Sequence, residues 1–340
     1  MSRLRVGCIG LGRMGSIYTR HLSARVPEAE LVAVADPAPG LAERAAAECG
    51  VPKWFEDYRE LITDCEVEAV VIATPASTHA VVIEAAAAAG RPIYCEKPLA
   101  LTLGECDRAV RIVERARLPF QVGFNRRFDA AYVQAKRLIE DGAIGTPVTF
   151  KSVSRDPMMP RLDYARPEVS GGLIVDMAIH DFDVGRWLMG SEVTRVSTEG
   201  GTLVFPELNT VGDFDNAVIN LRFGSGALGN VEVSRNALYG YDIRTEVLGS
   251  EGAVMVGALQ QTPVLLLTRE GARHDVMRYI VERFSDAYLA EVRHFVRMVQ
   301  GNERPGPTVY DGRAATEIAL AATVSYREGR PVSLPLTEGR

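Results

Sequence analysis

Short apolar runs alternate with amphipathic stretches along the first third of the chain. The runs are rich in Val, Ile and Ala, and the stretches between them carry apolar residues at helical spacing. This alternation predicts a parallel sheet with helices on both faces. The expected strands are 4–10, 31–36, 67–73, 92–96 and 119–123, and the expected helices are 13–24, 41–49, 81–89 and 103–115.

The pattern changes after Gly123. Longer strands with alternating apolar and polar residues dominate, which predicts a mainly antiparallel sheet with one face packed. The expected strands are 148–155, 193–201, 216–223, 227–235, 241–250 and a weaker run at 263–268; the expected helices are 130–140, a segment around 176–180, 286–299 and 311–327. The fold class is therefore α/β, with a doubly wound parallel sheet in residues 1–123. A C-terminal α+β domain with a large, mainly antiparallel open sheet is expected in residues 124–340.

Composition narrows the functional classes. At 340 residues the chain exceeds what one hydrophobic core usually holds, which agrees with two domains. A net charge of −6 gives no reason to expect nucleic acid or an anionic membrane as partner. The five cysteines are irregularly spaced, so we expect reduced thiols in a cytoplasmic protein and no zinc site. No apolar stretch is long enough for a transmembrane helix, and we expect no signal peptide.

A glycine motif joins the first expected strand to the first expected helix. It reads Gly10-Leu11-Gly12-Arg13-Met14-Gly15, in the position where glycines let a pyrophosphate approach a helix N-terminus. Asp36 ends the second expected strand, where an acid can bind the adenosine ribose hydroxyls. Together these features predict a Rossmann dinucleotide fold. No arginine follows Asp36 to neutralise a 2′-phosphate, so NAD is favoured over NADP.

Two further segments lie at the carboxyl ends of expected strands, where ligands bind in open α/β sheets. Thr74-Pro75 follows one strand, and we expect Thr74 and His79 to face the cofactor, although His79 could equally be a helix cap. Glu96-Lys97-Pro98 follows another strand. Lysine is scarce in this chain, in which arginine supplies most basic side chains. A lysine at this edge therefore suggests a role for its compact, titratable charge.

Asp176 precedes His180 by four residues in GGLIVDMAIHDFDVGRWLMG (171–190). In a regular helix the acid and the imidazole would project from the same face. Three interpretations compete: a general base with its helper, a pair of metal ligands, and a plain capped helix. The metal interpretation would add Asp181 and Asp183, but helical spacing does not bring all four side chains to one point.

These motifs together resemble the Gfo/Idh/MocA oxidoreductases over essentially the whole chain. The resemblance rests on the glycine motif, Thr74-Pro75 with His79, Glu96-Lys97-Pro98 and the GG-x-x-x-D-x-x-x-H segment. QVGFNRRFD (121–129) and GYDIRTEVLGSEG (240–252) look more narrowly like inositol 2-dehydrogenases. The resemblance implies an NAD-dependent enzyme acting on CH-OH donors, commonly assembled as a homotetramer through the outer faces of its sheets.

The resemblance also implies roles for individual residues. Lys97, Asp176 and His180 match the family's catalytic trio, and the Lys97-Pro98 bond is expected to be cis. His180 would be the general base, Lys97 would stabilise the developing alkoxide, and Asp176 would orient the imidazole or a neighbouring hydroxyl. The expected cofactor contacts are Gly10, Gly12, Arg13, Met14, Asp36, Thr74, Pro75, His79, Glu96 and Lys97. The expected substrate contacts are Lys97, Arg127, Arg155, Asp156, Asp176, His180 and Tyr239.

Several functions remain open from the sequence. The favoured one is oxidation of a secondary hydroxyl of a cyclic polyol, myo- or scyllo-inositol, to the ketone. A pyranose sugar such as glucose is an alternative substrate, because stereoisomers offer the same atoms at different angles. A dinucleotide-binding regulator without turnover and an NAD-dependent glycoside-cleaving enzyme are alternatives of other classes. Net formation of NADH would separate the dehydrogenases from these two.

Overall fold

The computed structural model describes residues 2–257 and 259–336, which form two compact units. The first unit comprises Met1–Phe128 and Asp286–Thr316, and the second comprises Asp129–Ser285 and Glu317–Arg340. Residues 286–316 thus belong to the first unit, whereas the sequence analysis placed them in the C-terminal domain. Chain position alone does not show that a distant helix packs against an earlier sheet.

The first unit is a doubly wound α/β structure. Its six strands are all parallel, in the order β3-β2-β1-β4-β5-β6. The strands are β1 Leu4–Ile9, β2 Ala29–Ala35, β3 Lys53–Phe55, β4 Ala69–Ile72, β5 Ile93–Glu96 and β6 Phe120–Gly123. The helices are α1 Arg13–Ala24, α2 Leu41–Cys49, α3 Tyr58–Thr63, α4 His79–Ala88 and α5 Leu103–Ala116, with short turns η1 Ala76–Thr78 and η2 Asn125–Phe128. The order reverses between β1 and β4, and this switch point is where such sheets bind ligands.

The second unit is built on a seven-stranded sheet in the order β12-β11-β7-β10-β9-β8-β15. Only the β7–β10 pair is parallel among the strand pairs described for this sheet. The strands are β7 Pro147–Arg155, β8 Val193–Gly201, β9 Asn216–Phe223, β10 Leu228–Ser234, β11 Asp242–Gly249, β12 Ala253–Val256 and β15 Val332–Ser333. The expected fold class of each domain is confirmed.

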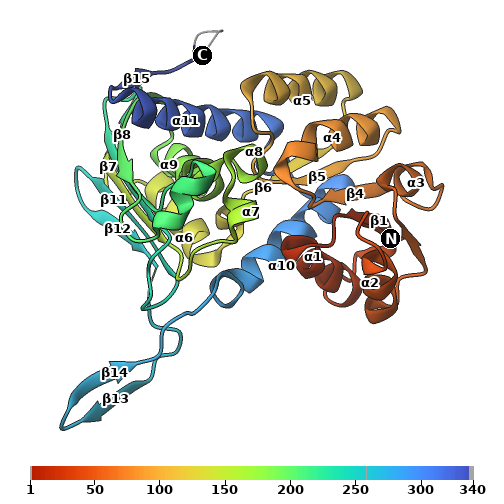
Figure 1. Ribbon diagram of the computed structural model, residues 1–340, viewed down its shortest axis with the longest axis horizontal. Coiled ribbons are helices and arrows are strands. Elements are labelled where there is room, and N and C mark those ends of the chain that lie inside the picture. Colours follow the sequence, from red (N-terminus) through yellow and green to blue (C-terminus); the bar gives the residue numbers. More distant parts are fainter. Residues whose placement is uncertain (1, 258, 337–340) are drawn as a thin grey trace. The chain divides into compact units, whose positions relative to one another are not determined.

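Helices cover one face of this second sheet (Figure 1). Along β7 the buried residues Phe150, Ser152 and Ser154 alternate with more exposed ones, so only one face of the strand is packed. The helices and turns are α6 Ala130–Glu140, α7 Leu162–Ala165, α8 Pro167–Ser170, η3 Ile174–Ala178, α9 Ile179–Met189 and η4 Pro206–Val211. Helices α10 Ile280–Val299 and α11 Val309–Glu328 each continue from one unit into the other along the chain.

One sequence prediction about this unit is confirmed only in part, and another is wrong. The run at 263–268 does form a strand, β13 Leu265–Thr268, but it pairs only with β14 Gly271–His274 and not with the main sheet. Figure 1 shows this hairpin projecting from the rest of its unit. The segment around Asp176 is also not one regular helix, because η3 is a π-helical turn that precedes α9.

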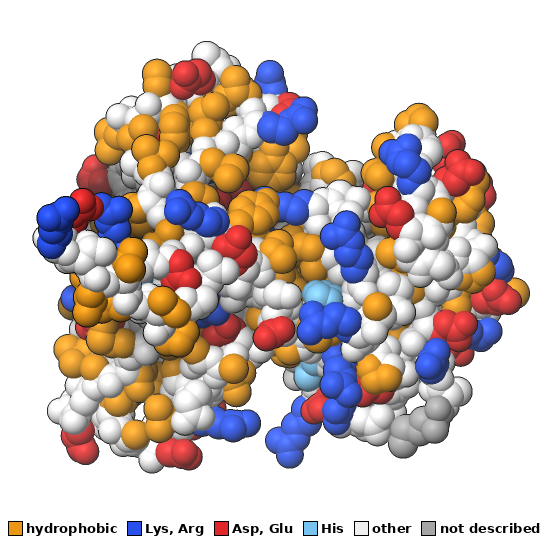
Figure 2. All heavy atoms as spheres, turned by 90° about the horizontal axis from the view of Figure 1, so that it is seen from below, with side chains coloured by type: hydrophobic (Ala, Val, Ile, Leu, Met, Phe, Trp, Pro, Cys, Tyr) orange, Lys and Arg blue, Asp and Glu red, His pale blue; other side chains and the backbone are white. Residues whose placement is uncertain are grey.

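The described surface carries charges of both signs. Figure 2 shows acidic and basic side chains interspersed over the face in view, with hydrophobic side chains among them. Among the described helices, none combines the length and apolar character needed to cross a membrane.

Candidate functional site

The glycine motif forms a tight turn against the end of β4. Gly10 has φ +85°, and a Cβ on it would lie 2.7 Å from the backbone of Ala73 and Thr74. A Cβ on Gly15 would collide with the Gly10 carbonyl oxygen. A Cβ on Gly12, by contrast, would have no atom within 4 Å among the described residues, so the turn is open on that side. Gly10 and Gly15 are thus required for packing, whereas the absence of a side chain at Gly12 leaves room for a ligand.

Helix α1 begins directly after this turn with a free N-terminal end. Gly12 is its N-cap and supplies no side-chain hydrogen bond, and its first turn holds no acidic residue. The first turn of α1 therefore holds no carboxylate of its own to pair with the positive end of the helix dipole, as at helix ends that bind pyrophosphate. Arg13 and Gly12 are exposed there, and Met14 is half-buried. These residues fit the pyrophosphate of a dinucleotide.

Asp36 is fixed by two backbone amides. Leu11 donates its N–H to Oδ2 at 2.7 Å, and Ala38 donates to Oδ1 at 2.9 Å. The carboxylate therefore touches the glycine turn itself while staying half-exposed. Each carboxylate oxygen can accept a further hydrogen bond. The position and chemistry of Asp36 fit the ribose hydroxyls of NAD.

His79 differs from its expected cofactor contact. Its ring is only 1% exposed, and both nitrogens face backbone carbonyls, Pro98 O at 2.7 Å from Nδ1 and Thr74 O at 2.9 Å from Nε2. Burial lowers the pKa of His79, although the two carbonyl contacts oppose that effect. The ring connects the loop after β4 to the loop after β5, with no ring nitrogen left for a cofactor. Only tertiary contacts could show this.

The Glu96-Lys97-Pro98 turn ends β5, and the Lys97-Pro98 bond is cis as expected. Lys97 is half-buried, whereas Glu96 is buried and its Oε2 accepts the Lys97 amide at 3.0 Å. Burial raises the pKa of Glu96, while the Tyr18 hydrogen bond and the Lys97 charge oppose the rise. Glu96 is thus enclosed by protein groups, and its contacts hold the turn that carries Lys97.

Asp176 and His180 lie in the second unit, on η3 and at the start of α9. Both side chains are half-buried. Tyr164 donates its hydroxyl to Asp176 Oδ1 at 2.9 Å, and Arg235 Nη2 lies 3.6 Å from Asp176 Oδ2. π-Helical turns of this kind are rare and occur frequently at functional sites.

Asp181, which the metal interpretation would use, is fully buried. The Ser154 hydroxyl donates to it at 2.8 Å, and Ser152 also bonds it, so it ties α9 to β7. Among the described residues, no group of three or more His, Cys, Asp or Glu is placed to hold a metal ion.

Three expected substrate contacts have other partners within their own units. Arg127 donates to Asp311 Oδ1 at 2.8 Å in the first unit. Burial opposes ionisation of Asp311, but the Arg127 charge and Thr308 hydrogen bonds outweigh it and lower the pKa of that carboxyl. In the second unit Arg155 donates to Tyr239 at 2.8 Å and to Glu232 at 2.7 Å.

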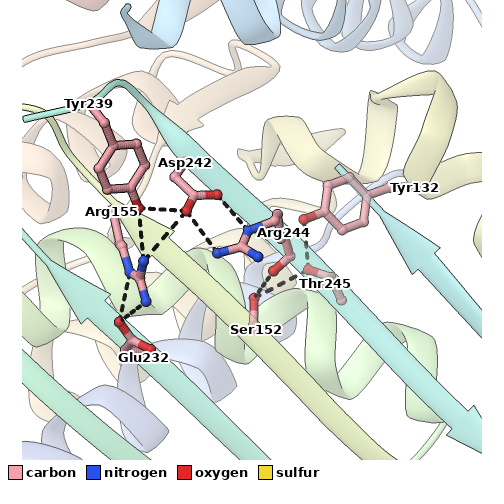
Figure 3. Close-up of polar contacts among 8 residues, drawn as sticks. All are labelled: Tyr132, Ser152, Arg155, Glu232, Tyr239, Asp242, Arg244 and Thr245. Atoms are coloured by element: carbon pink, nitrogen blue, oxygen red, sulfur yellow. Dashed lines mark hydrogen bonds and ion pairs between the residues drawn. The ribbon is translucent and has the colours of Figure 1, made fainter. Parts of the chain in front are cut away.

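Figure 3 shows how the Arg155 network continues to the next strand. Tyr239 donates to Asp242 Oδ2 at 2.8 Å, and Arg244 Nε donates to Asp242 Oδ1 at 2.7 Å. Ser154 points toward α9, so strand alternation puts Arg155 on the opposite face of β7. Arg155 and Tyr239 therefore lie together, on the other side of this strand from α9.

Asp156 follows β7, and its backbone is fixed at the end of β10. Its N–H donates to Ser234 O at 2.8 Å, and its carbonyl accepts the Ala237 N–H at 2.9 Å. Arg235 and Asn236 lie between those two partners, and Arg235 is not among the site residues predicted from the sequence. Along β10 every second residue points inward, as the buried Val231 and Val233 do, and Arg235 is the next residue in this alternation. An arginine at an inward position was the available signal.

Comparison with known proteins matches both parts of the chain. Residues 4–124 match the oxidoreductase family with an NAD-binding Rossmann fold, and residues 132–255 match the GFO/IDH/MocA C-terminal domain. The scyllo-inositol 2-dehydrogenase (NAD(+)) of Bacillus subtilis is 42% identical over 98% of this chain and 96% of its own. The myo-inositol 2-dehydrogenase of Thermotoga maritima is 40% identical over 97% of this chain and 98% of its own.

A solved structure is similar over the same length. The scyllo-inositol dehydrogenase of Lactobacillus casei, crystallised with NAD(H) and scyllo-inositol, superposes with a TM-score of 0.93 at 30% identity. The match covers 98% of this chain and 99% of that one.

Proposed function

Because the chain belongs to the GFO/IDH/MocA family of NAD-binding oxidoreductases, we propose that it oxidises a secondary hydroxyl of a cyclic polyol to the ketone. The preferred substrates are myo- and scyllo-inositol. The observation that carries this proposal is the near full-length similarity to inositol 2-dehydrogenases, at 42% and 40% identity for two of them. The Asp36 carboxylate, set against the glycine turn, supports NAD as the cofactor.

When bound, NAD would supply the acceptor for the hydride that leaves the carbinol carbon. In our proposal His180 takes the hydroxyl proton as general base, because imidazole titrates near neutral pH. Lys97 stabilises the negative charge that develops on the same oxygen. The Glu96 contact to the Lys97 amide supports a fixed position for that lysine backbone. Asp176 binds and orients a polyol hydroxyl or the imidazole.

Polyol recognition requires several fixed donors and acceptors. Arg127 and Asp156 remain the proposed additional contacts, whereas Arg155 and Tyr239, which lie on the other side of β7 from α9, are not proposed to meet the polyol beside His180. The fixed backbone of Asp156 beside Arg235 supports its part in this set. His79 is proposed instead to hold the Thr74 and Pro98 loops together.

The proposal is tested by NAD reduction with inositol isomers and aldohexoses. We expect NADH formation with the highest kcat/KM for myo- or scyllo-inositol. A higher value for glucose would favour the pyranose dehydrogenase. NAD binding without NADH formation on any of these substrates would favour the regulator, and cleavage of aryl glycosides without net NADH would favour the glycosidase.

A homotetramer and a cytoplasmic location are also part of the proposal. Apolar side chains on the face of the second sheet opposite α9 support self-association: Val218, Leu228, Leu248 and Met255 are each exposed. The cysteines are free thiols, which suits a reducing compartment.

The proposed homotetramer is tested by light scattering, which should give four times the chain mass. Met255→Glu should lower that mass, whereas Leu203→Glu, an exposed loop control, should not.

A further inference from the structure

Arg235 carries a charge in the interior of the second unit. Its side chain is 1% exposed, and it directly follows β10. Nη1 forms an ion pair with Asp213, whose side chain is equally buried. Among the described residues, Nη2 has no hydrogen-bond partner, although it is buried. Leaving a buried donor unpaired is costly, so this atom needs an explanation.

Nη2 forms a long ion pair with the Asp176 carboxylate. The Nη2–Oδ2 distance is 3.6 Å, beyond a hydrogen bond but within the range of strong charge attraction. The other oxygen, Oδ1, accepts the Tyr164 hydroxyl at 2.9 Å. Two different groups therefore address the two oxygens of one carboxylate, which fixes the rotation of the Asp176 side chain.

Asp213 links the same arginine to the backbone that carries Asp176. Its Oδ1 accepts the Leu173 N–H at 2.9 Å, just before η3. Gly172 has φ +75°, and a Cβ there would lie 2.9 Å from Asp213 Oδ1. The carboxylate thus fills the space above the glycine turn. Asp213 and Arg235 together contact both the main chain before η3 and the side chain on it.

We propose that Arg235 is a positioning residue for the dehydrogenase reaction, which orients the Asp176 carboxylate by directing Nη2 at its Oδ2. This inference rests on the proposed function, in which Asp176 acts on the polyol or on His180. Asp213 is the counter-ion that makes burial of the guanidinium possible. The gap of 3.6 Å leaves room for Asp176 to close onto Nη2 when the site is occupied, as hydrogen bonds in active sites often tighten then.

The charged and titratable groups around Asp176 come from several elements. Tyr164 on α7 and Arg235 after β10 contact its carboxylate, Asp213 after η4 pairs with Arg235, and His180 and Asp181 follow it along the chain on α9. Ser152 and Ser154 bond Asp181, which ties that carboxylate to β7. Arg235 is the cation that two carboxylates, Asp176 and Asp213, share.

The test compares two variants that should act in opposite directions on the acidic limb of kcat/KM. Arg235→Met removes the cation and leaves Asp176 near a second carboxylate, so Asp176 accepts a proton more readily. We expect the limb to move up by about one pH unit. Asp213→Asn frees the guanidinium for Asp176 and should move the limb down. If Arg235 acted only in folding, the two variants would not shift the acidic limb of kcat/KM in opposite directions.

Controls separate positioning from folding and from the proposed function. Arg235→Met should lower kcat/KM by about 10²-fold through misplacement, with NAD affinity unchanged. Arg235→Lys should restore the position of the limb. Arg186→Met, which removes a largely buried arginine paired with Glu192 in the same unit, should leave the limb in place. If the acidic limb of the kcat/KM profile stays in place in both Arg235→Met and Asp213→Asn, the proposal is overturned.

A second measurement needs no turnover. A double-mutant cycle of Arg235→Met and Asp176→Asn, read by urea unfolding, should show favourable coupling between the two side chains. Zero coupling would overturn the proposal even if the variants were active. If wild-type protein forms no NADH with any polyol, the proposed function fails, while this cycle still decides whether Arg235 acts on Asp176.

Discussion

Single candidate side chains in each unit are held by contacts that the unit makes with itself. Asp36 accepts two backbone amides, His79 contacts two carbonyls, and Asp176 accepts a tyrosine hydroxyl. Such contacts remove rotational freedom before any ligand arrives, which lowers the entropic cost of binding and of reaching the transition state. The chemistry of each proposed group therefore depends on neighbours that do not themselves react.

Substitution of the proposed acid–base partners tests the mechanism at this scale. Lys97→Ala and His180→Ala should each lower kcat by about 10²–10⁴-fold, because proton transfer and alkoxide stabilisation are lost. NAD affinity, measured by fluorescence titration, should stay close to that of the wild type. Lys53→Ala, which removes a surface lysine paired with Asp64, is the matched control and should leave kcat unchanged. Near-wild-type turnover of either test variant would contradict the proposed mechanism.

Asp36 offers a separate test of cofactor preference. Asp36→Ala should weaken NAD binding by about 2 kcal/mol, the worth of a hydrogen bond to a charged group, or roughly thirtyfold in Kd. NADP should lose much less, because the carboxylate repels a 2′-phosphate. Asp36→Asn keeps an acceptor for the Leu11 amide and shows how much of the loss comes from the turn itself. An unchanged ratio of the two Kd values would remove Asp36 from the ribose.

At the scale of elements, helices α1, α2, α4 and α5 of the first unit were predictable because their periodicity is local, whereas the six-residue helix α3 was missed. Helices α1 and α2 begin and end where the sequence pattern places them. Strands β3 and β12 were missed, since three or four residues are too few to show alternation. The pairing of β13 with β14 outside the main sheet was missed, because the apolar sequence of a strand does not show which strand it pairs with.

The site was predictable to a similar extent and for similar reasons. The places of Lys97 and Asp36 at strand ends were predictable because the topology of a doubly wound sheet fixes them, and the roles of both residues stay predictions. Tyr164, Asp213 and Arg235 were not found, because their roles arise from tertiary contacts. The π-helical turn at Asp176 was missed because one extra residue in a turn leaves the apolar spacing almost unaltered.

The glycine turn before η3 provides a test of this element. Gly171 has φ +84°, and a Cβ there would lie 2.5 Å from Val175 in η3, whereas Gly190 has φ +59° and open space. Both Gly→Ala changes should cost about 1–2 kcal/mol for the left-handed backbone. Gly171→Ala should in addition displace η3 and lower kcat. Equal stability and equal kcat in the two variants, measured by urea unfolding and turnover, would contradict a strained turn.

At the scale of the whole molecule, the C-terminal segment completes the interior of the first unit. Glu291 on α10 accepts the Tyr18 hydroxyl at 2.8 Å, and Tyr18 also bonds Glu96 and Tyr94. Two carboxyls and two phenols are thus buried together next to the turn that carries Lys97. Burial, and then the Glu96 charge, raise the pKa of Glu291 well above its usual range. The folded chain therefore keeps a proton on this buried carboxyl at pH values at which the unfolded chain would release it.

This raised pKa predicts how stability depends on pH. A carboxyl whose pKa is raised by folding binds more protons in the native state, so its contribution to stability falls as pH rises above the unfolded value, about 4.3. Glu291→Gln keeps the shape and removes that ionisation, so the variant should gain stability relative to the wild type between acid and neutral pH. Each unit of the raised pKa is worth about 1.4 kcal/mol. Glu48→Gln, an exposed change of the same type, should show no such trend in urea unfolding. A constant difference between wild type and Glu291→Gln across this pH range would mean that Glu291 ionises in the native state as freely as in the unfolded one.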